Sequence, residues 1–210
     1  MPGKRIFQIG FNRCGTTSLY YFFRRNGIEA IHNDNGEIAR NFVRRKAADQ
    51  DPFLDYPDVT FFSDMGTSFG GVVIETFREF RYIYRFYPDA YFILNVRDMQ
   101  RWLLSRLNDA NLLERHKAVR GFGTTEEALL RWTVDWNTHL RDVKTFFVDK
   151  PSQLLVFDIE RDDANKIVEF LKTDFALDAS QYATSNETLN RHRRFATVPS
   201  YLIVPPVKSS

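Results

Sequence analysis

The sequence predicts an α/β fold, a three-layer sandwich in which a mostly parallel sheet of about five strands carries helices on both faces. Two observations lead to this prediction. Short apolar runs with the length of buried strands alternate along the chain with longer stretches of helical periodicity. A glycine-bounded loop, residues 10–18, joins the first apolar run to the first helical stretch, where parallel sheets place ligand-binding loops. The chain length favours a single domain over residues 1–210.

Five apolar runs flanked by turn residues define the expected strands: residues 5–10, 28–32, 59–64, 91–96 and 153–158. The expected helices cover residues 17–26, 72–86, 99–107, 126–147 and 163–171. The charged stretch 40–51 and the stretch 109–125 are interpreted as mobile insertions, and residues 199–210 as an extended or disordered tail. Since ligands of parallel sheets gather where the strands end, the residues that follow each strand are the candidates for function.

The overall charge is small, because 29 Lys and Arg residues stand against 27 Asp and Glu residues for a net charge of +2. We therefore expect neither nucleic acid nor a membrane as a partner, and any anion site has to be local. Cys14 is the only cysteine, which excludes an internal disulfide framework and fits a reducing, cytoplasmic compartment. No signal-peptide core follows Met1, and no run approaches the ~20 apolar residues of a membrane span.

The strongest feature of the sequence is the loop that follows the first strand. Gly10 and Gly15 lie five residues apart, as in the phosphate-binding signature G-x-x-x-x-G-K-[ST], and glycines let successive N–H groups turn toward one anion. The helix that follows adds the positive end of its dipole. The residues predicted to surround the phosphate are Arg13, Cys14, Gly15, Thr16, Thr17 and Ser18.

Thr16 stands where nucleoside triphosphatases carry the lysine that reaches the β- and γ-phosphates. Arg13 is the only side-chain cation of the loop. The missing lysine argues against ATP or GTP chemistry and for a shorter donor. An ordinary helix cap formed by glycine and threonine is the structural alternative.

A second candidate motif follows the apolar run at residues 91–96. That run is followed by Arg97, and Ser105 lies eight residues later on the next expected helix. A guanidinium at a strand end and a hydroxyl two turns into the following helix can converge on one phosphate, with bidentate bonds from the arginine. Asp98 is interpreted as a helix cap and Trp102 as a core residue.

Together, Gly-x-x-x-x-Gly-Thr-Thr and Arg-x7-Ser resemble the two donor-binding motifs of the sulfotransferases that use 3'-phosphoadenosine 5'-phosphosulfate (PAPS). The resemblance covers residues 4–107. The forms Arg-Cys-Gly-Thr-Thr-Ser-Leu and Val-Arg-Asp-x3-Trp-x2-Ser are closer to a small, little-characterised sulfotransferase group than to the cytosolic aryl sulfotransferases. The resemblance implies a P-loop-like fold, PAPS as co-substrate and PAP, its desulfated form, as product. It also implies that the first motif holds the 5'-phosphosulfate and the second the 3'-phosphate. Arg13 replaces a lysine that many members carry.

A late basic cluster is a further candidate for the donor site. In cytosolic sulfotransferases a late basic loop closes over the 3'-phosphate, and Arg191, Arg193 and Arg194 occupy a comparable place in this chain. A solvated run of charges is the alternative interpretation.

Sulfuryl transfer requires a base for the acceptor and stabilisation of charge on the leaving phosphate and the sulfuryl oxygens, for which Arg13 and Thr17 are the natural candidates. His32 ends the second expected strand, where several sulfotransferase groups place a catalytic side chain, and its ordinary pKa near ~6.5 suits proton abstraction. Asp64 ends the third strand and resembles in position the catalytic histidine of the cytosolic enzymes, but a carboxylate needs burial to be an effective base. Either residue is a candidate for the base, and the alternative is that Asp64 orients His32 or the acceptor.

The acceptor is expected to be a small molecule or a glycan, and no metal is expected because the histidines show no ligand spacing. The aromatic residues at 61, 62, 69, 82, 84, 86 and 87 are interpreted mainly as core, with an apolar acceptor cleft as the alternative. Two other functions compete. One is a nucleotide kinase or nucleoside triphosphatase in which Asp64 or Asp98 holds magnesium, and the other is a catalytically degenerate nucleotide-binding module.

Overall fold

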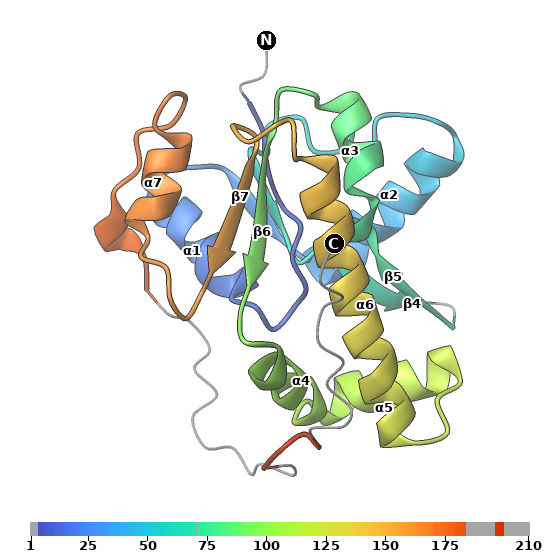
Figure 1. Ribbon diagram of the computed structural model, residues 1–210. Helices are drawn as coiled ribbons and strands as arrows, with labels where there is room; N and C mark the ends of the chain where they lie inside the picture. The colour runs from blue at the N-terminus through green and yellow to red at the C-terminus, as the bar shows by residue number, and fades with distance from the viewer. Residues whose placement is uncertain (1–3, 70, 184–195, 200–210) are drawn as a thin grey trace.

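The structure, a computed structural model, describes residues 4–69, 71–183 and 196–199. At its centre lies a five-stranded parallel sheet in the order β2-β3-β1-β6-β7 (Figure 1). The strands are β1 (Ile6–Gln8), β2 (Ala30–His32), β3 (Phe61–Ser63), β6 (Tyr91–Val96) and β7 (Leu154–Asp158). Each lies within one of the five predicted runs, so the prediction of an α/β fold with a parallel sheet is confirmed.

Both faces of the sheet are apolar, because alternate residues of its central strands point to opposite sides. On β1, Ile6 belongs to one buried cluster and Phe7 to the other. On β6, Ile93 and Leu94 divide in the same way. A strand that is apolar on both faces needs a layer of helices over each, which explains the continuous apolar runs of the sequence.

Helices cover both faces and complete the three layers (Figure 1). One face carries α1 (Thr16–Arg25) and α7 (Asn165–Leu171). The other carries α2 (Glu37–Ala47), α3 (Phe80–Phe86) and α6 (Thr125–Phe146). Beyond the carboxyl ends of β6 and β7, α4 (Met99–Leu107) and α5 (Ala110–Arg120) pack against each other and against α6. Short 3-10 helices cover Asp34–Gly36, Thr76–Glu79 and Ala179–Gln181.

The helix predicted over residues 72–86 is wrong in its first half. Val72–Glu75 forms strand β5, which pairs antiparallel with β4 (Gly66–Phe69) in a separate two-stranded sheet. A 3-10 turn then leads into α3. Two consecutive glycines followed by three β-branched residues favour a hairpin over a helix, and this signal was overlooked. The hairpin contacts α5 through β5 and so forms one wall of the region beyond the sheet.

The interpretation of residues 40–51 and 109–125 as mobile insertions is also wrong, because α2 and α5 occupy most of them. Ile38 and Phe42 are buried one turn apart on α2. Leu112 and His116 are buried with the same spacing on α5. The charged residues that suggested insertions lie on the other faces of these helices, so one face of each helix packs against the rest of the molecule.

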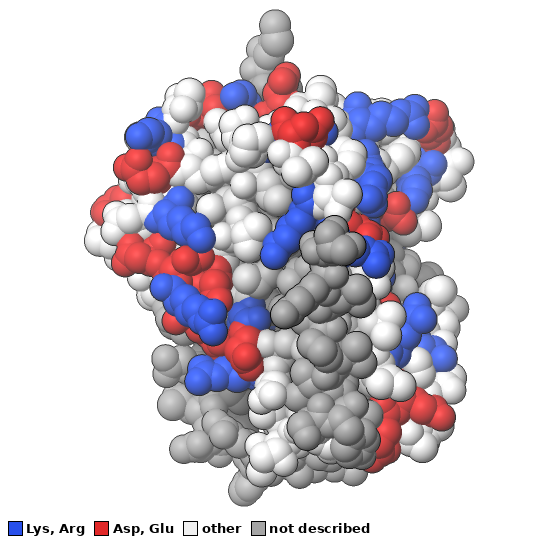
Figure 2. Space-filling view, in the orientation of Figure 1, with Lys and Arg blue, Asp and Glu red and all other residues white. Residues whose placement is uncertain are grey.

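Of the predicted tail, residues 199–210, only Pro199 belongs to the described part of the chain. Among the described residues, no helix combines the length and the apolar character that crossing a bilayer requires. Figure 2 shows basic and acidic side chains interspersed over one face of the molecule, as the net charge of +2 leads one to expect.

Candidate active site

The loop between β1 and α1 has a backbone that few residue types tolerate. Arg13 and Gly15 both adopt left-handed angles, with φ of 66° and 74°. A non-glycine residue in this region is uncommon and marks a constrained loop. A Cβ atom at Gly10 would lie 2.1 Å from the backbone oxygen of Asn95, so the loop passes too close to β6 for any other residue there.

Two buried polar side chains, Gln8 in β1 and Asn95 in β6, hold this loop. Oδ1 of Asn95 accepts from the Gly10 amide at 3.0 Å, and Nδ2 of Asn95 donates to the Cys14 carbonyl at 2.6 Å. Nε2 of Gln8 donates to Oδ1 of Asn95 at 2.5 Å. A fully bonded buried network of this kind fixes one conformation. The sequence analysis missed both residues, although a polar side chain inside an apolar strand is a signal for them.

The two predicted donor motifs meet in space. Nε of Arg13 donates to Oγ of Ser105 at 3.0 Å, and Nη1 of Arg97 donates to the backbone carbonyl of Arg13 at 3.2 Å. Nε of Arg97 is buried and has no hydrogen-bond partner within the described part of the chain. A buried donor without a partner is costly, and an anion bound at Arg97 would satisfy it.

Two acidic side chains that the sequence analysis missed flank these arginines. Oε1 of Glu160, which follows β7, accepts from Nη2 of Arg97 at 2.6 Å. Burial alone would raise the pKa of Glu160, but hydrogen bonds from Arg97 and from the Asp98 amide outweigh it and lower that pKa. Asp109 lies 3.7 Å from Nη1 of Arg13. Arg13 and Arg97 therefore each have a carboxylate neighbour, and a phosphate bound at either arginine would lie close to that carboxylate.

The first turn of α1 completes the loop. The first intrahelical hydrogen bond runs from the Leu19 amide to the Gly15 carbonyl at 3.1 Å, so the positive end of the helix dipole faces the loop. Thr16 and Ser18 are buried, and Thr17 between them is partly exposed. Cys14 packs in the larger core cluster, where burial raises the pKa of its thiol. The thiol therefore stays neutral, and Cys14 reaches the loop only through its backbone.

His32 and Asp64 lie side by side where β2 and β3 end. Nε2 of His32 is 3.8 Å from Oδ2 of Asp64, and Nδ1 of His32 is 2.9 Å from Oγ of Ser63. Burial lowers the pKa of His32 and raises that of Asp64, while the attraction between the two groups offsets part of each shift. Arg13 also lowers the pKa of Asp64. Because burial moves the two pKa values toward each other, the two groups can share one proton.

The backbone of Asp64 is connected to the network that holds the loop between β1 and α1. Asp64 has a left-handed φ of 51°, and its amide donates to Oε1 of Gln8 at 2.9 Å. Asn33, which follows β2, donates from Nδ2 to the carbonyls of Asp64 at 3.1 Å and Gly66 at 2.7 Å. Gln8 thus positions both the loop and Asp64, and Asn33 positions the start of the hairpin.

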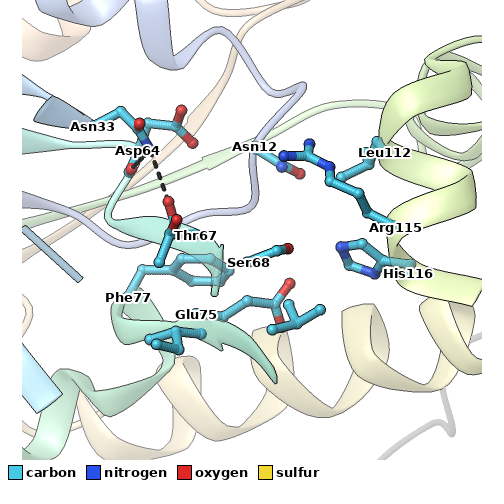
Figure 3. A pocket seen from close by; sticks show the side chains of 13 residues that line it. Asn12, Asn33, Asp64, Thr67, Ser68, Glu75, Phe77, Leu112, Arg115 and His116 are labelled. Carbon is cyan, nitrogen blue, oxygen red and sulfur yellow. Dashed lines mark hydrogen bonds between the residues drawn. The ribbon is translucent and has the colours of Figure 1, made fainter. Parts of the chain in front are cut away.

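A cavity of about 220 Å³ lies beside Asp64 (Figure 3). Two side chains of α5, Arg115 and His116, face those of the β4–β5 hairpin across it. Neither Arg13 nor His32 is part of its lining. The lining residues are Asn12, Asn33, Asp64, Gly66, Thr67, Ser68, Val73, Ile74, Glu75, Phe77, Leu112, Arg115 and His116.

Several other predicted residues have structural roles. Oδ1 of Asp98 accepts from the Arg101 amide at 3.0 Å and caps α4, as predicted. Trp102 is fully buried, as predicted, and its Nε1 donates to the carbonyl of Asn12 at 3.0 Å. The cluster of Arg191, Arg193 and Arg194 lies outside the described residues.

The aromatic residues near the third strand belong mainly to the core. Phe61 and Phe62 are fully buried, and Tyr82, Tyr84 and Tyr87 pack against the larger core cluster. The cavity is therefore not the apolar aromatic cleft that was the alternative interpretation. Within residues 4–69, 71–183 and 196–199, no group of three or more His, Cys, Asp or Glu side chains is arranged to hold a metal ion.

Comparison with known proteins bears directly on this site. A family model described as a sulfotransferase domain matches residues 5–118. The match spans both motifs, the His32–Asp64 pair and most of α5. Among curated proteins, no sequence matches the chain.

Proposed function

Since the chain belongs to the sulfotransferase family, we propose that its donor is PAPS and that it transfers the sulfuryl group to a hydroxyl or amine of its acceptor. The observation that carries this proposal is the meeting of Arg13, Arg97 and Ser105 at the loop that precedes α1. It brings two anion-binding features together, a helix N-terminus and a pair of guanidinium groups. A donor with phosphates at its 3' and 5' positions needs two such features.

The donor roles follow the two motifs. The loop of residues 10–18 holds the 5'-phosphosulfate through its backbone amides and the side chains of Thr16, Thr17 and Ser18. Arg97 and Ser105 bind the 3'-phosphate, and the buried Nε of Arg97 supports this role because it has no partner among the described residues. Arg191, Arg193 and Arg194 are proposed to add to the 3'-phosphate site.

PAPS supplies a sulfuryl group: its sulfur–oxygen bond to the 5'-phosphate breaks as a bond to the acceptor forms, and PAP leaves. Arg13 and the first turn of α1 stabilise the negative charge that the leaving phosphate gains. A base takes the proton of the attacking hydroxyl or amine. All of these roles fall to side chains and backbone amides of the chain, and no metal is part of the proposal.

We propose that Asp64 is the base and that His32 is its partner. Asp64 lines the cavity, whereas His32 does not, so only the carboxylate faces the space an acceptor can enter. Burial raises the pKa of Asp64 and so makes its carboxylate more basic than an ordinary aspartate. His32, 3.8 Å away, can receive the proton in turn.

Thermal melts with PAP, PAPS, ATP and ATP plus magnesium test this function. A ligand that binds the folded state raises the melting temperature, and the rise grows with the logarithm of the ratio of ligand concentration to Kd. We expect a rise with PAP and PAPS that magnesium does not alter. A rise confined to ATP with magnesium would contradict the proposal and favour a kinase. A rise with PAP but no transfer to any acceptor would favour a degenerate binding module.

A further inference from the structure

The cavity beside Asp64 carries an unsatisfied hydrogen-bond acceptor. Oδ1 of Asn12 is buried and has no partner in the described ranges, and Asn12 lines the cavity. A buried acceptor without a donor costs about 1–3 kcal/mol, and a molecule that donates to it recovers that cost. A ligand of this cavity is therefore favoured if it carries an O–H or N–H group near Asn12.

The opposite wall carries a donor whose tautomer is fixed. Nε1 of Trp132 donates to Nδ1 of His116 at 3.2 Å, and a tryptophan N–H can only donate. Nδ1 therefore accepts, and the hydrogen of the neutral imidazole sits on Nε2. Burial, helped by nearby arginines, lowers the pKa of His116 to about 3, so the ring stays neutral at physiological pH. The ring of His116 points into the cavity from α5 (Figure 3).

The remaining lining is rich in groups that hydrogen-bond. Asn33, Thr67 and Ser68 line the cavity alongside Val73, Ile74, Phe77 and Leu112. A hydroxyl group both donates and accepts hydrogen bonds. A molecule with several hydroxyls can therefore bond to Asn12, His116 and these side chains at the same time. A flat aromatic acceptor with one hydroxyl would displace water from most of these polar side chains without forming hydrogen bonds to them, which lowers its affinity.

The charges of the cavity favour an uncharged occupant. Asp64 and Glu75 both line it, which disfavours an anion. The carboxylate of Glu75 is already paired, at 3.0 Å from Nη2 of Arg120 and 3.2 Å from Nη1 of Arg78, so it does not call for a cation. Arg115 is exposed but also lines the cavity, and its positive charge offsets part of the charge of Asp64. The volume of about 220 Å³ lies below the ~300–1,000 Å³ of pockets for drug-sized ligands, and suits a single small ring.

We propose that this cavity is the acceptor site and that it takes an uncharged, hydroxyl-rich acceptor of the sugar or polyol class, one ring at a time. The inference rests on the proposed function, because it places the acceptor hydroxyl at Asp64. It goes further in naming Asn12 and His116 as the residues that select a polyol over a phenol.

Ligand-observed NMR tests the inference on the full chain, with and without PAP. The probes are a mixture of methyl glycosides and inositol, and a mixture of simple phenols, each at millimolar concentration. We expect saturation transfer to the polyols and at least ten-fold weaker binding of the phenols. Polyols that fail to bind overturn the inference, whether or not the phenols bind. PAP binding is measured separately by calorimetry. A failure of the donor proposal can therefore be distinguished from a failure of the acceptor proposal.

Two variants assign the selectivity to the cavity. Asn12→Leu keeps the backbone carbonyl that Trp102 uses and removes the side-chain acceptor, and Thr67→Val removes a hydroxyl at nearly constant volume. We expect each to weaken polyol binding about five-fold or more. Thr67 lies on β4, outside the loop proposed to bind the donor, so Thr67→Val should also keep PAP affinity within two-fold of the parent. Glu114→Ala, on an exposed position of α5 outside the lining, is the control and should change neither. Unchanged polyol binding in Thr67→Val and in a folded Asn12→Leu would place the acceptor elsewhere.

Discussion

Arg97 and Glu160 form an ion pair at 2.6 Å in which the carboxylate occupies the guanidinium that a 3'-phosphate would bind. A phosphate that reaches Arg97 has to approach this carboxylate or displace it, and the two anions repel each other. Glu160→Gln keeps a hydrogen-bond acceptor for Arg97 and removes the charge. We therefore predict that Glu160→Gln binds PAP about 3- to 10-fold more tightly than the parent, as measured by isothermal titration calorimetry.

Glu169→Gln removes a charge from an exposed position of α7 and serves as the control for that variant. It should leave PAP affinity unchanged. Weaker binding of PAP by Glu160→Gln would mean that the carboxylate mainly positions Arg97, and that repulsion of the phosphate is the smaller effect.

Gly10→Ala tests the close approach of the phosphate loop to β6. A Cβ there would lie 2.1 Å from a backbone oxygen, so the loop has to move away from Asn95 and lose the bonds that hold it. We predict a loss of about 2 kcal/mol or more in the free energy of unfolding and at least ten-fold weaker PAP binding. At Gly123 the nearest atom to a new Cβ is 3.5 Å away, so Gly123→Ala should match the parent in urea melts and in calorimetry. Similar behaviour of the two alanine variants would show that the loop tolerates displacement.

The acidic limb of the pH–rate profile tests the assignment of the base. Asp64 must be deprotonated to act, and burial raises its pKa, so kcat/KM should rise with pH with a midpoint above the ordinary aspartate pKa of about 3.9. Asp64→Asn should lose at least ~10²-fold in turnover while retaining PAP affinity. His32→Gln should move the limb to higher pH, because the positive charge of His32 lowers the pKa of Asp64. If the limb vanishes in His32→Gln instead, His32 is the base.

The sequence predicted the sheet and the position of the loop between β1 and α1 well, because both depend on local pattern. Every strand of the parallel sheet is an apolar run, and Gly10 and Gly15 mark the loop whatever surrounds it. That Arg97 and Ser105 approach the same loop could be expected for the same reason, since a strand end and a helix turn fix their spacing.

The parts that the sequence did not predict depend on contacts between distant segments. Asn95 matters because it reaches Gly10 across the sheet, and Glu160 because β7 ends beside β6. The cavity also needs the hairpin and α5 to face each other, and both had been assigned differently. Which of His32 and Asp64 faces the acceptor is a matter of side-chain direction, which spacing in the sequence does not specify.

His139 links stability to pH. It is buried, and Nε2 of its ring is bonded to the carbonyl of Ile9 at 2.6 Å. Burial lowers its pKa to about 4, whereas in the unfolded chain its pKa is the ordinary value of about 6.5. Between these two pH values the unfolded chain therefore binds a proton at this residue and the folded chain does not. The free energy of unfolding should therefore fall as the pH drops through this range, by at most about 3 kcal/mol from this residue.

His139→Gln can still donate to Ile9 but does not titrate, so urea melts from pH 7 to pH 4 should show a shallower loss of stability. Some loss will remain, because His116 is also buried with a lowered pKa. An identical pH dependence in the parent and in His139→Gln would show that folding does not shift the pKa of His139.

The most direct test of the central claim, that the chain binds PAPS through Arg97, compares PAP with 5'-AMP, which lacks the 3'-phosphate. Calorimetry on the parent should show PAP binding far more tightly than 5'-AMP. Arg97→Ala should weaken PAP binding by roughly 2 to 4 kcal/mol, because the 3'-phosphate loses its charged partner. It should weaken 5'-AMP binding much less, because the loop of residues 10–18 loses only the hydrogen bond to the Arg13 carbonyl. Equal affinity of the parent for PAP and 5'-AMP, or parental PAP affinity in a folded Arg97→Ala, would contradict the account.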